Sequence, residues 1–315
     1  MQGNTPKISV LMLTYNRADR LPRAIEAILA QTFSDFELVI VDNGSTDASG
    51  RVAENYALKD KRISVVHTER GSVGFGRNAA LRYARGELVA FVDDDDYAFP
   101  GFLEFLHALL LKHEADISIC GSMKEIGDEL APNLMFDECL VLGAEEAVSE
   151  LLGRTRINAA TATKMFKRDL FSDIMFPENC SVEDIAATYK FLASANKVVA
   201  HGVPQYCFSR HGGNLTSFTD DDRLLSPGQL VEYLAAFRER TEYLQRKLPK
   251  IGAYAQYSEW SYMISMCHKI ISNKLEDCFG ILEEVRHTLL DCFDEFACSP
   301  YIEEFEREYL FNYIK

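Results

Sequence analysis

The chain has 315 residues, of which 47% are hydrophobic and 26% charged, and this is the composition of a folded globular protein, not of a disordered one. Its formal net charge is −15, from 33 basic and 48 acidic residues, which argues against nucleic acid as a partner. The N-terminus lacks the regions of a signal peptide, and no run approaches the roughly 18 apolar residues of a spanning helix, so a cytoplasmic protein is expected.

The first 115 residues alternate short apolar runs with segments of helical periodicity. The apolar runs predict strands, at residues 8–13, 36–41, 63–67 and 88–92. The intervening and following segments predict helices, at residues 20–30, 46–58, 76–85 and 101–113. Near-continuous apolar strands that alternate with helices indicate an α/β, Rossmann-like fold, with a mainly parallel sheet covered by helices on both faces.

Beyond residue 115 the pattern changes twice. Residues 116–222 are mixed, with a short strand, a helix near 143–152 and further apolar runs. Residues 223–315 are almost wholly helical, and their apolar spacings of four and three suit packing against a neighbouring helix or the main domain. We therefore predict one domain over 1–222, made of halves that meet at residue 115, and a C-terminal all-helical region.

Eight cysteines are scattered along the chain without a CxxC pair. In a chain of this length, such a distribution favours reduced, mostly buried thiols over a disulfide framework or a zinc site.

Polar residues follow three of the predicted strands. The first strand runs into Thr14, Tyr15 and Asn16, and the second into Asp42. The fourth runs into four consecutive aspartates, residues 93–96. Because parallel sheets bind ligands at the carboxyl ends of their strands, these three endings are expected to form one site.

The aspartate run suits a divalent cation. Hard carboxylate oxygens select Mg²⁺ or Mn²⁺, and such an ion is normally shared with the phosphates of a substrate. The alternative is an acidic, solvated turn, because aspartate favours turns and helix N-termini. Asp96 is interpreted as the cap of the helix that follows.

Asp42 and Arg77 each leave two interpretations open. Asp42 is either part of an Asx turn or helix cap, or an acceptor for a base or ribose.

Glycines 71, 74 and 76 lack the GxGxxG spacing, which argues against an NAD or FAD oxidoreductase. Arg77 opens a helix close to the expected ligand, or is a surface arginine.

Two later segments carry further candidates. Glu183 and Asp184 stand at a helix start, where acidic side chains complement the helix dipole and where a carboxylate can also act as a general base. Arg210 and His211 precede two glycines, in a loop that could close over a phosphate.

Together these stretches resemble the family 2 inverting glycosyltransferases with the GT-A fold. The resemblance is carried by VLMLTYNRADRLPRAIEAILAQTFSDFELVIVDNGSTDASG, GFGRNAALRYARGELVAFVDDDDYAFPGFL, FPENCSVEDIAATYKF and YCFSRHGGNLTS. It extends from residue 7 to about 218, in the order and spacing of the family. The usual LDSDD is VDDDD here, and the last segment has Ser209-Arg210-His211 where an aromatic-Arg pattern is common.

The resemblance implies a role for each matching residue. Asp184 falls at the position of the catalytic base, and Asp95 at that of the ligand to a Mn²⁺ or Mg²⁺ ion bridging the diphosphate. Arg210 and His211 fall near the diphosphate. The residues placed at the nucleotide, with Tyr15 near the base and Asp94 facing the ribose, are Thr14, Tyr15, Asn16, Asp42, Arg77, Asp93 and Asp94.

The implied reaction is a single in-line displacement at an anomeric carbon, with inversion. The implied donor is a nucleotide-sugar, usually a UDP-sugar, and the acceptor hydroxyl belongs to a saccharide, a lipid-linked glycan or a protein glycan. The implied halves are a nucleotide-binding half, 1–115, and an acceptor-binding half, 116–222. The C-terminal helices are expected either to pack on the chain itself or to form a homodimer, while the acidity of that region opposes binding to anionic lipid at the inner face of the membrane.

Two other classes of protein remain as alternatives. A sugar-nucleotide pyrophosphorylase would carry a Gly-rich, basic phosphate loop after the first strand, where this chain has LTYNRADRL. A non-catalytic nucleotide-sugar binding protein would have lost its base, whereas Glu183-Asp184 and the aspartate run are intact.

Overall fold

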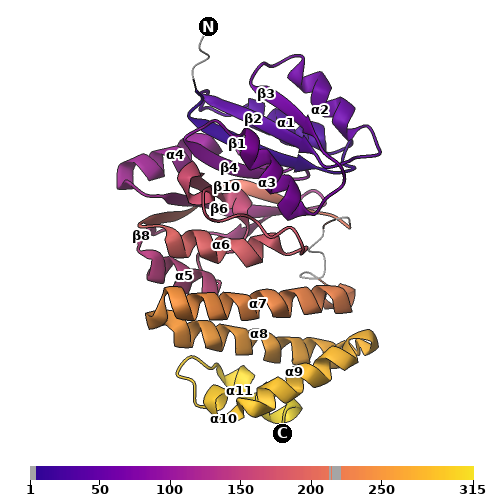
Figure 1. Ribbon diagram of the computed structural model, residues 1–315, viewed down its shortest axis with the longest axis vertical. Helices are drawn as coiled ribbons and strands as arrows, with labels where there is room; N and C mark the ends of the chain where they lie inside the picture. The colour runs from indigo at the N-terminus through magenta and orange to yellow at the C-terminus, as the bar shows by residue number, and fades with distance from the viewer. Residues whose placement is uncertain (1–4, 213, 215–220) are drawn as a thin grey trace. The chain divides into compact units, whose positions relative to one another are not determined.

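The computed structural model describes residues 5–212, 214 and 221–315 (Figure 1). Contacts divide the chain into two compact units between Arg210 and His211. The boundary predicted after residue 222 therefore lies inside the second unit. Each of the eight cysteines is a free thiol.

The described strands of the first unit form one ten-stranded sheet. Its path is β3-β2-β1-β4-β9-β6-β10-β5, with β7 beside β6 and β8 beside β10. The strands are β1 (Ile8–Thr14), β2 (Phe36–Asp42), β3 (Ile63–His67), β4 (Leu88–Asp93), β5 (Tyr97–Ala98), β6 (Ile117–Ile126), β7 (Glu129–Leu134), β8 (Cys139–Leu142), β9 (Lys164–Lys167) and β10 (Val198–Arg210).

The four predicted N-terminal strands are confirmed, and they pair in parallel as β3-β2-β1-β4. The second half of the sheet begins with β9, which is antiparallel to both β4 and β6. The parallel pair β6 and β10 follows. This arrangement confirms the predicted α/β class, with a central sheet whose N-terminal strands are parallel.

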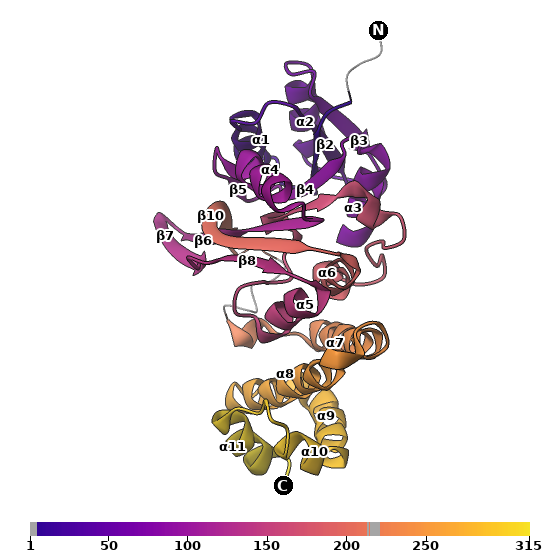
Figure 2. The same ribbon diagram turned by 90° about the vertical axis from the view of Figure 1, so that its left-hand side faces the viewer.

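Helices cover both faces of the sheet because β1 and its neighbours are apolar on both sides (Figures 1 and 2). Helices α1 and α4 pack on Val10 and Met12, whereas α3 packs on Leu13 of the opposite face. The helices of this unit are α1 (Leu21–Leu29), α2 (Ser49–Ala57), α3 (Val73–Tyr83), α4 (Phe102–His113), α5 (Ala144–Gly153) and α6 (Glu183–Ser194), with 3-10 turns η1 (Thr161–Thr163) and η2 (Arg168–Phe171).

Helix α3 begins three residues before its predicted start at residue 76. The reason is Ser72, whose hydroxyl accepts a hydrogen bond from the Phe75 N–H and caps the helix. This earlier start places Gly74 inside the helix, and the helix buries both Gly74 and Arg77.

The second unit is helical, as predicted. Its helices are α7 (Pro227–Lys247), α8 (Gly252–Ser272), α9 (Phe279–Asp291), α10 (Phe293–Ala297) and α11 (Glu304–Tyr313), with 3-10 turns η4 (Asp222–Leu224), η5 (Pro249–Ile251) and η6 (Glu276–Cys278). The regularly spaced apolar residues of α7 pack against α8, where the rings of Phe237 and Tyr262 stack with centroids 4.1 Å apart. None of the helices in the described ranges has both the length and the apolarity needed to cross a membrane.

Candidate active site

The predicted strand endings lie at one edge of the sheet. In the parallel ladders, Thr14 pairs with Asp42 and Leu13 pairs with Asp93. The ends of β1, β2 and β4 therefore stand side by side, as expected for a ligand site of a parallel sheet.

The loop after β1 is tied to the loop after β2 by side chains that bond the backbone. Asn16 has a left-handed backbone (φ 51°), and its Oδ1 accepts from the Thr46 N–H at 2.8 Å. In return, Ser45 Oγ accepts from the Asn16 N–H at 3.0 Å, and Ser49 Oγ accepts from the Arg17 N–H at 2.8 Å. These bonds give both loops a fixed shape.

Asp42 makes the turn that one of its two interpretations predicted. Its Oδ1 accepts from the Ser45 N–H at 3.0 Å. Its Oδ2 lies 3.1 Å from Nδ1 of His67, whose Nε2 lies 3.1 Å from Glu54. The hydrogen bond to Asp42 raises the pKa of the His67 imidazole. Sequence patterns gave no sign of His67, because it stands at the end of the neighbouring strand β3 and not within a motif.

Tyr15 contacts both Asp94 and Arg70. Its N–H donates to Asp94 Oδ2 at 3.3 Å. The guanidinium of Arg70 lies 3.4 Å from the centroid of its ring, a cation–π contact that no sequence motif indicated.

The four aspartates form a complete turn, in which the Asp96 N–H donates to the Asp93 carbonyl at 3.3 Å. Their exposure alternates: Asp93 and Asp95 are partly exposed, whereas Asp94 and Asp96 are buried. Burial raises the pKa of Asp94 to about 7. The run is thus not a uniformly solvated acidic turn, since two of its members are inside the protein.

Asp96 does not cap the helix that follows, and that interpretation was wrong. The N-cap of α4 is Gly101, whereas the Asp96 carboxylate accepts from the Ser209 N–H at 2.8 Å and from the Tyr206 hydroxyl at 3.1 Å. Burial raises the pKa of Asp96 well above its usual range. Asp96 therefore joins the aspartate turn to the end of β10.

The exposed members of the turn suit a divalent ion that is shared with a substrate. Asp95 Oδ2 lies 3.6 Å from the Arg17 guanidinium. Within residues 5–212, 214 and 221–315, no group of three or more His, Cys, Asp or Glu side chains is close enough to hold a metal alone. Mg²⁺ typically takes only one or two protein carboxylates and completes its coordination with phosphates and water. Asp93 and Asp95 fit that limited contribution.

Arg77 is buried, so the interpretation as a surface arginine was wrong. Its Nη2 lies 3.3 Å from Asp93 Oδ1. Its Nη1 lies 3.1 Å from Glu183 Oε1 and donates to Thr161 Oγ1 at 2.7 Å. Arg77 thereby connects the aspartate turn with the first turn of α6, where Asp184 stands.

Glu183 and Asp184 differ in their surroundings. Glu183 is 5% exposed, and burial raises its pKa to about 7 in spite of Arg77. Asp184 is partly exposed, and its Oδ1 accepts from the Ile185 N–H at 2.7 Å. The carboxylate of Asp184 is thus the more accessible of the two.

Lys164 was not predicted, although it belongs to the same region. It is fully buried on β9, and its Nζ donates to the Ala160 carbonyl at 2.6 Å and to Asn158 at 3.3 Å. Burial lowers its pKa to about 7, while the nearby charge of Asp184 opposes that shift. Nothing in the short segment KMFK distinguishes this lysine from an exposed one.

Arg210 and His211 fall on either side of the division between the units. Arg210 ends β10, directly after the Ser209 that Asp96 holds. The His211 N–H donates to Asn214 Oδ1 at 2.6 Å. Residues 213 and 215–218 of the same predicted motif lie outside the described residues, and contact of Arg210 or His211 with a diphosphate stays a prediction.

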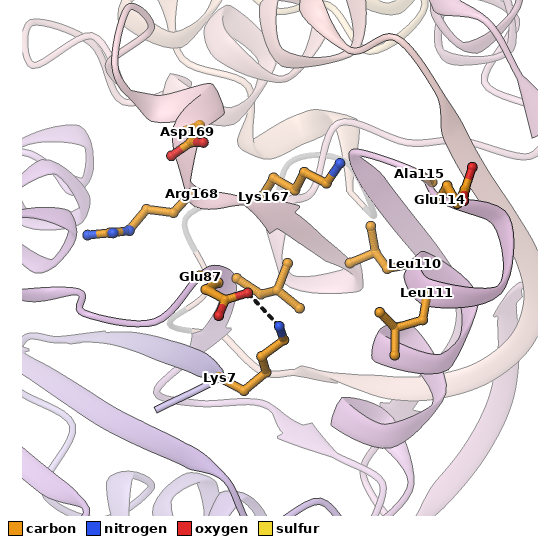
Figure 3. A pocket seen from close by; sticks show the side chains of 10 residues that line it. Lys7, Glu87, Leu110, Leu111, Glu114, Ala115, Lys167, Arg168 and Asp169 are labelled. Atoms are coloured by element: carbon orange, nitrogen blue, oxygen red, sulfur yellow. Dashed lines mark hydrogen bonds and ion pairs between the residues drawn. The ribbon is translucent and has the colours of Figure 1, made fainter. Parts of the chain in front are cut away.

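A cavity of about 400 Å³ lies elsewhere, at the start of β4 and the end of α4 (Figure 3). Its lining combines leucines 88, 110 and 111 with charged residues. Lys7 is paired with Glu87 inside it, and Lys167 is paired with Asp116. It contains none of the predicted site residues.

Residues 9–175, more than half of the chain, match the family model described as glycosyl transferase family 2. The chain belongs to glycosyl transferase family 2. This confirms the predicted family and the predicted class of enzyme, a glycosyltransferase.

Similar proteins come from several bacteria. The chain is 29% identical to the glycosyltransferase GlyG of Streptococcus pneumoniae over 66% of its own length and 72% of that protein. It is 33% identical to the poly(ribitol-phosphate) beta-N-acetylglucosaminyltransferase TarS of Staphylococcus aureus over 67% of its own length. It spans only 37% of TarS, and 63% of the uncharacterized glycosyltransferase EpsJ of Bacillus subtilis.

Solved structures show the same fold. A crystal structure of S. aureus TarS aligns with a TM-score of 0.62 at 26% identity, over 76% of this chain and 40% of that one. TarS 1–349 in complex with UDP-GlcNAc aligns over 97% of this chain and 79% of that one, with a TM-score of 0.60 at 24% identity. A mannosyltransferase from Pyrobaculum calidifontis, in complex with GDP-Man and Mn²⁺, aligns over 98% of this chain and 86% of that one, with a TM-score of 0.54 at 15% identity.

Proposed function

We propose that this family 2 enzyme transfers a sugar, with inversion, from a UDP-sugar to a hydroxyl acceptor in a reaction that depends on a divalent metal. One observation supports this most strongly: the Arg77 guanidinium bridges Asp93, at the end of β4, and Glu183, next to Asp184. This bridge brings two sets of carboxylates close together. Those at the end of β4 suit a metal ion bound to a diphosphate, and the more accessible carboxylate of Asp184 suits a general base.

UDP as the nucleotide is supported by TarS, whose 1–349 fragment is solved in complex with UDP-GlcNAc. We propose that Thr14, Asn16 and Asp42 hold the nucleoside and that Tyr15 lies near the base. Asp94 is proposed to face the ribose. Its carboxylate accepts a hydrogen bond from the Tyr15 N–H, which would link the ribose side of the nucleoside site with the base side.

Asp95 and Asp93 would hold Mn²⁺ or Mg²⁺ against the diphosphate, and the ion would supply positive charge to the departing group. Arg210 and His211 are proposed as further diphosphate contacts. Arg77 belongs to the nucleotide side through Asp93.

Asp184 is proposed as the general base. Its partly exposed carboxylate would take the proton of the acceptor hydroxyl as that oxygen attacks the anomeric carbon from the face opposite the leaving diphosphate. Because the reaction has one displacement, the configuration inverts.

A surface polysaccharide or a glycoprotein glycan is the proposed destination. TarS supports this, since its name describes transfer to poly(ribitol-phosphate). Action in the cytoplasm or at the inner face of the membrane, and a homodimer through the C-terminal helices, stay predictions from the sequence.

The test is release of UDP from UDP-GlcNAc and UDP-glucose with Mn²⁺, with and without acceptors. A glycosyltransferase releases UDP faster with a suitable acceptor and forms an inverted product. A pyrophosphorylase would instead need pyrophosphate and form a nucleoside triphosphate. Tight UDP binding with no turnover across donors and acceptors would favour a non-catalytic binding protein.

A further inference from the structure

Helix α3 contacts both halves of the candidate site through buried polar residues. Arg77 is 8% exposed, and Asn78 is 1% exposed. Arg77 reaches the segments that carry the proposed metal ligands and the proposed base, and Asn78 reaches the segment before the base.

The Arg77 guanidinium holds oxygens from three separate segments: Asp93 at the end of β4, Thr161 in η1 and Glu183 in α6. It also lies over the rings of Phe91 and Phe176, about equally far from both, at 5.6 and 5.5 Å from their centroids. A planar fork with several fixed N–H directions can satisfy such a set, whereas a lysine supplies a single point of charge.

The residue after Arg77 fixes the approach to α6. Asn78 Nδ2 donates to the Phe176 carbonyl and to Glu178, both at 2.9 Å, and its Oδ1 accepts from the Phe176 N–H at 3.0 Å. One turn earlier, a Cβ on Gly74 would lie 2.1 Å from the Pro177 carbonyl oxygen. Helix α3 therefore holds the segment before Asp184 at van der Waals distance.

Arg77 is also the cation among several anions. Asp93, Glu183 and Asp184 all act electrostatically on it. Without the Arg77 guanidinium, the ion pairs that join Asp93 to Glu183 would be lost, and the buried Glu183 carboxyl would have lost its cation.

We propose that Arg77, anchored on Glu183, is a positioning residue that holds the aspartate turn and Asp184 at a fixed separation, and that it acts on the nucleotide only through Asp93. This inference rests on the proposed function. It assigns the buried Glu183 to the same task, which leaves the proton transfer to Asp184.

The variant Arg77→Lys distinguishes a positioning role of Arg77 from direct binding of Arg77 to the nucleotide. Because a misplacement of about 1 Å can cost on the order of 100-fold in rate, we expect kcat to fall about 10- to 100-fold. The dissociation constant of UDP with Mn²⁺, measured by calorimetry, should change less than about threefold. A loss of UDP affinity of tenfold or more, with kcat retained, would show that Arg77 binds the nucleotide and would overturn the inference.

A double variant keeps the test decisive if Arg77→Lys does not fold. Arg77→Met with Glu183→Met removes both charges together and leaves apolar side chains of similar length, which buried pairs often tolerate. It should fold, bind UDP as the wild type does, and show the same loss of kcat as Arg77→Lys. Wild-type kcat in this double variant would equally overturn the inference.

Glu37→Gln is the matched control, because Glu37 is buried and paired with Arg85 at the opposite end of the sheet. It should lower the melting temperature and leave kcat within about twofold. An equal loss of kcat in this control would show that any broken buried pair has the effect, and would also overturn the inference. If the wild type transfers no sugar from any donor, the proposed function fails first, and that result is separate from the outcomes above.

Discussion

The two halves of the candidate site are held together by different forces. On the nucleotide side, side chains of Asn16, Asp42 and Ser45 bond backbone groups, so the loops after β1 and β2 are shaped by polar contacts within and between them. On the acceptor side, the buried Glu183 is held by the Arg77 guanidinium from α3, and the buried Lys164 bonds Asn158 and Ala160. The first half therefore depends on many small contacts, and the second on a few that are costly to remove.

The largest expected effect is on the acceptor side. Asp184→Asn should lower the rate of transfer about 100- to 10,000-fold, because the amide cannot take the acceptor proton. UDP binding should stay within about threefold, as measured by calorimetry. Asp173→Asn, the same change at an exposed position before α6, is the control. Normal turnover of Asp184→Asn would remove the base assignment.

Asp95→Ala should impair metal-dependent binding on the nucleotide side of the site. The loss of a hard oxygen ligand should weaken the Mn²⁺-dependent part of UDP binding by about tenfold or more and abolish most turnover. Titration of UDP with and without Mn²⁺ measures this. Asp128→Ala, in the exposed turn between β6 and β7, should change neither quantity. Unaltered Mn²⁺ dependence in Asp95→Ala would exclude Asp95 as the ligand.

Lys164→Met should change the pH dependence of stability. The folded protein releases the Lys164 proton near pH 7, whereas the unfolded chain keeps it to about pH 10.4. Between these values the unfolded state binds more protons, so the wild type should gain stability relative to Lys164→Met as the pH rises from 7 to 9. Melting temperatures of both proteins at several pH values test this. A constant difference would show that Lys164 stays protonated in the fold.

The smallest expected effect is at His67. His67→Ala removes one hydrogen bond from Asp42 and should weaken UDP binding about three- to tenfold. His67→Gln can still donate to Asp42 and should recover most of the affinity. The raised pKa of His67 means that its stabilising ionic contact is present at low pH and is lost as the pH rises through that pKa. If His67→Ala and His67→Gln bind UDP with equal affinity, the hydrogen bond from residue 67 to Asp42 does not contribute to nucleotide binding.

The sequence was most informative where structure is local. The apolar runs predicted β1 to β4, and the polar residues after them predicted one edge with Thr14, Asp42 and Asp93. These features depend on neighbours in the chain, so periodicity and turn residues reveal them.

Contacts between distant segments left no such pattern. Asp96 was interpreted from its neighbours as a helix cap, but its partners are at Tyr206 and Ser209. Lys164 and the Arg77–Glu183 pair are likewise defined by the way β9 and α3 pack, which spacing along the chain does not encode.

The aspartate run also has a definite length. Its four residues are all four positions of one turn, closed by the bond from the Asp96 N–H to the Asp93 carbonyl, and exposed and buried side chains alternate within it. A deletion or insertion here would shift every later carboxylate to the opposite environment, sending a buried one to solvent and an exposed one inside. In homologous chains, the residue types of this four-residue turn should therefore vary more readily than its length. Gaps in an alignment of those chains should fall outside the turn.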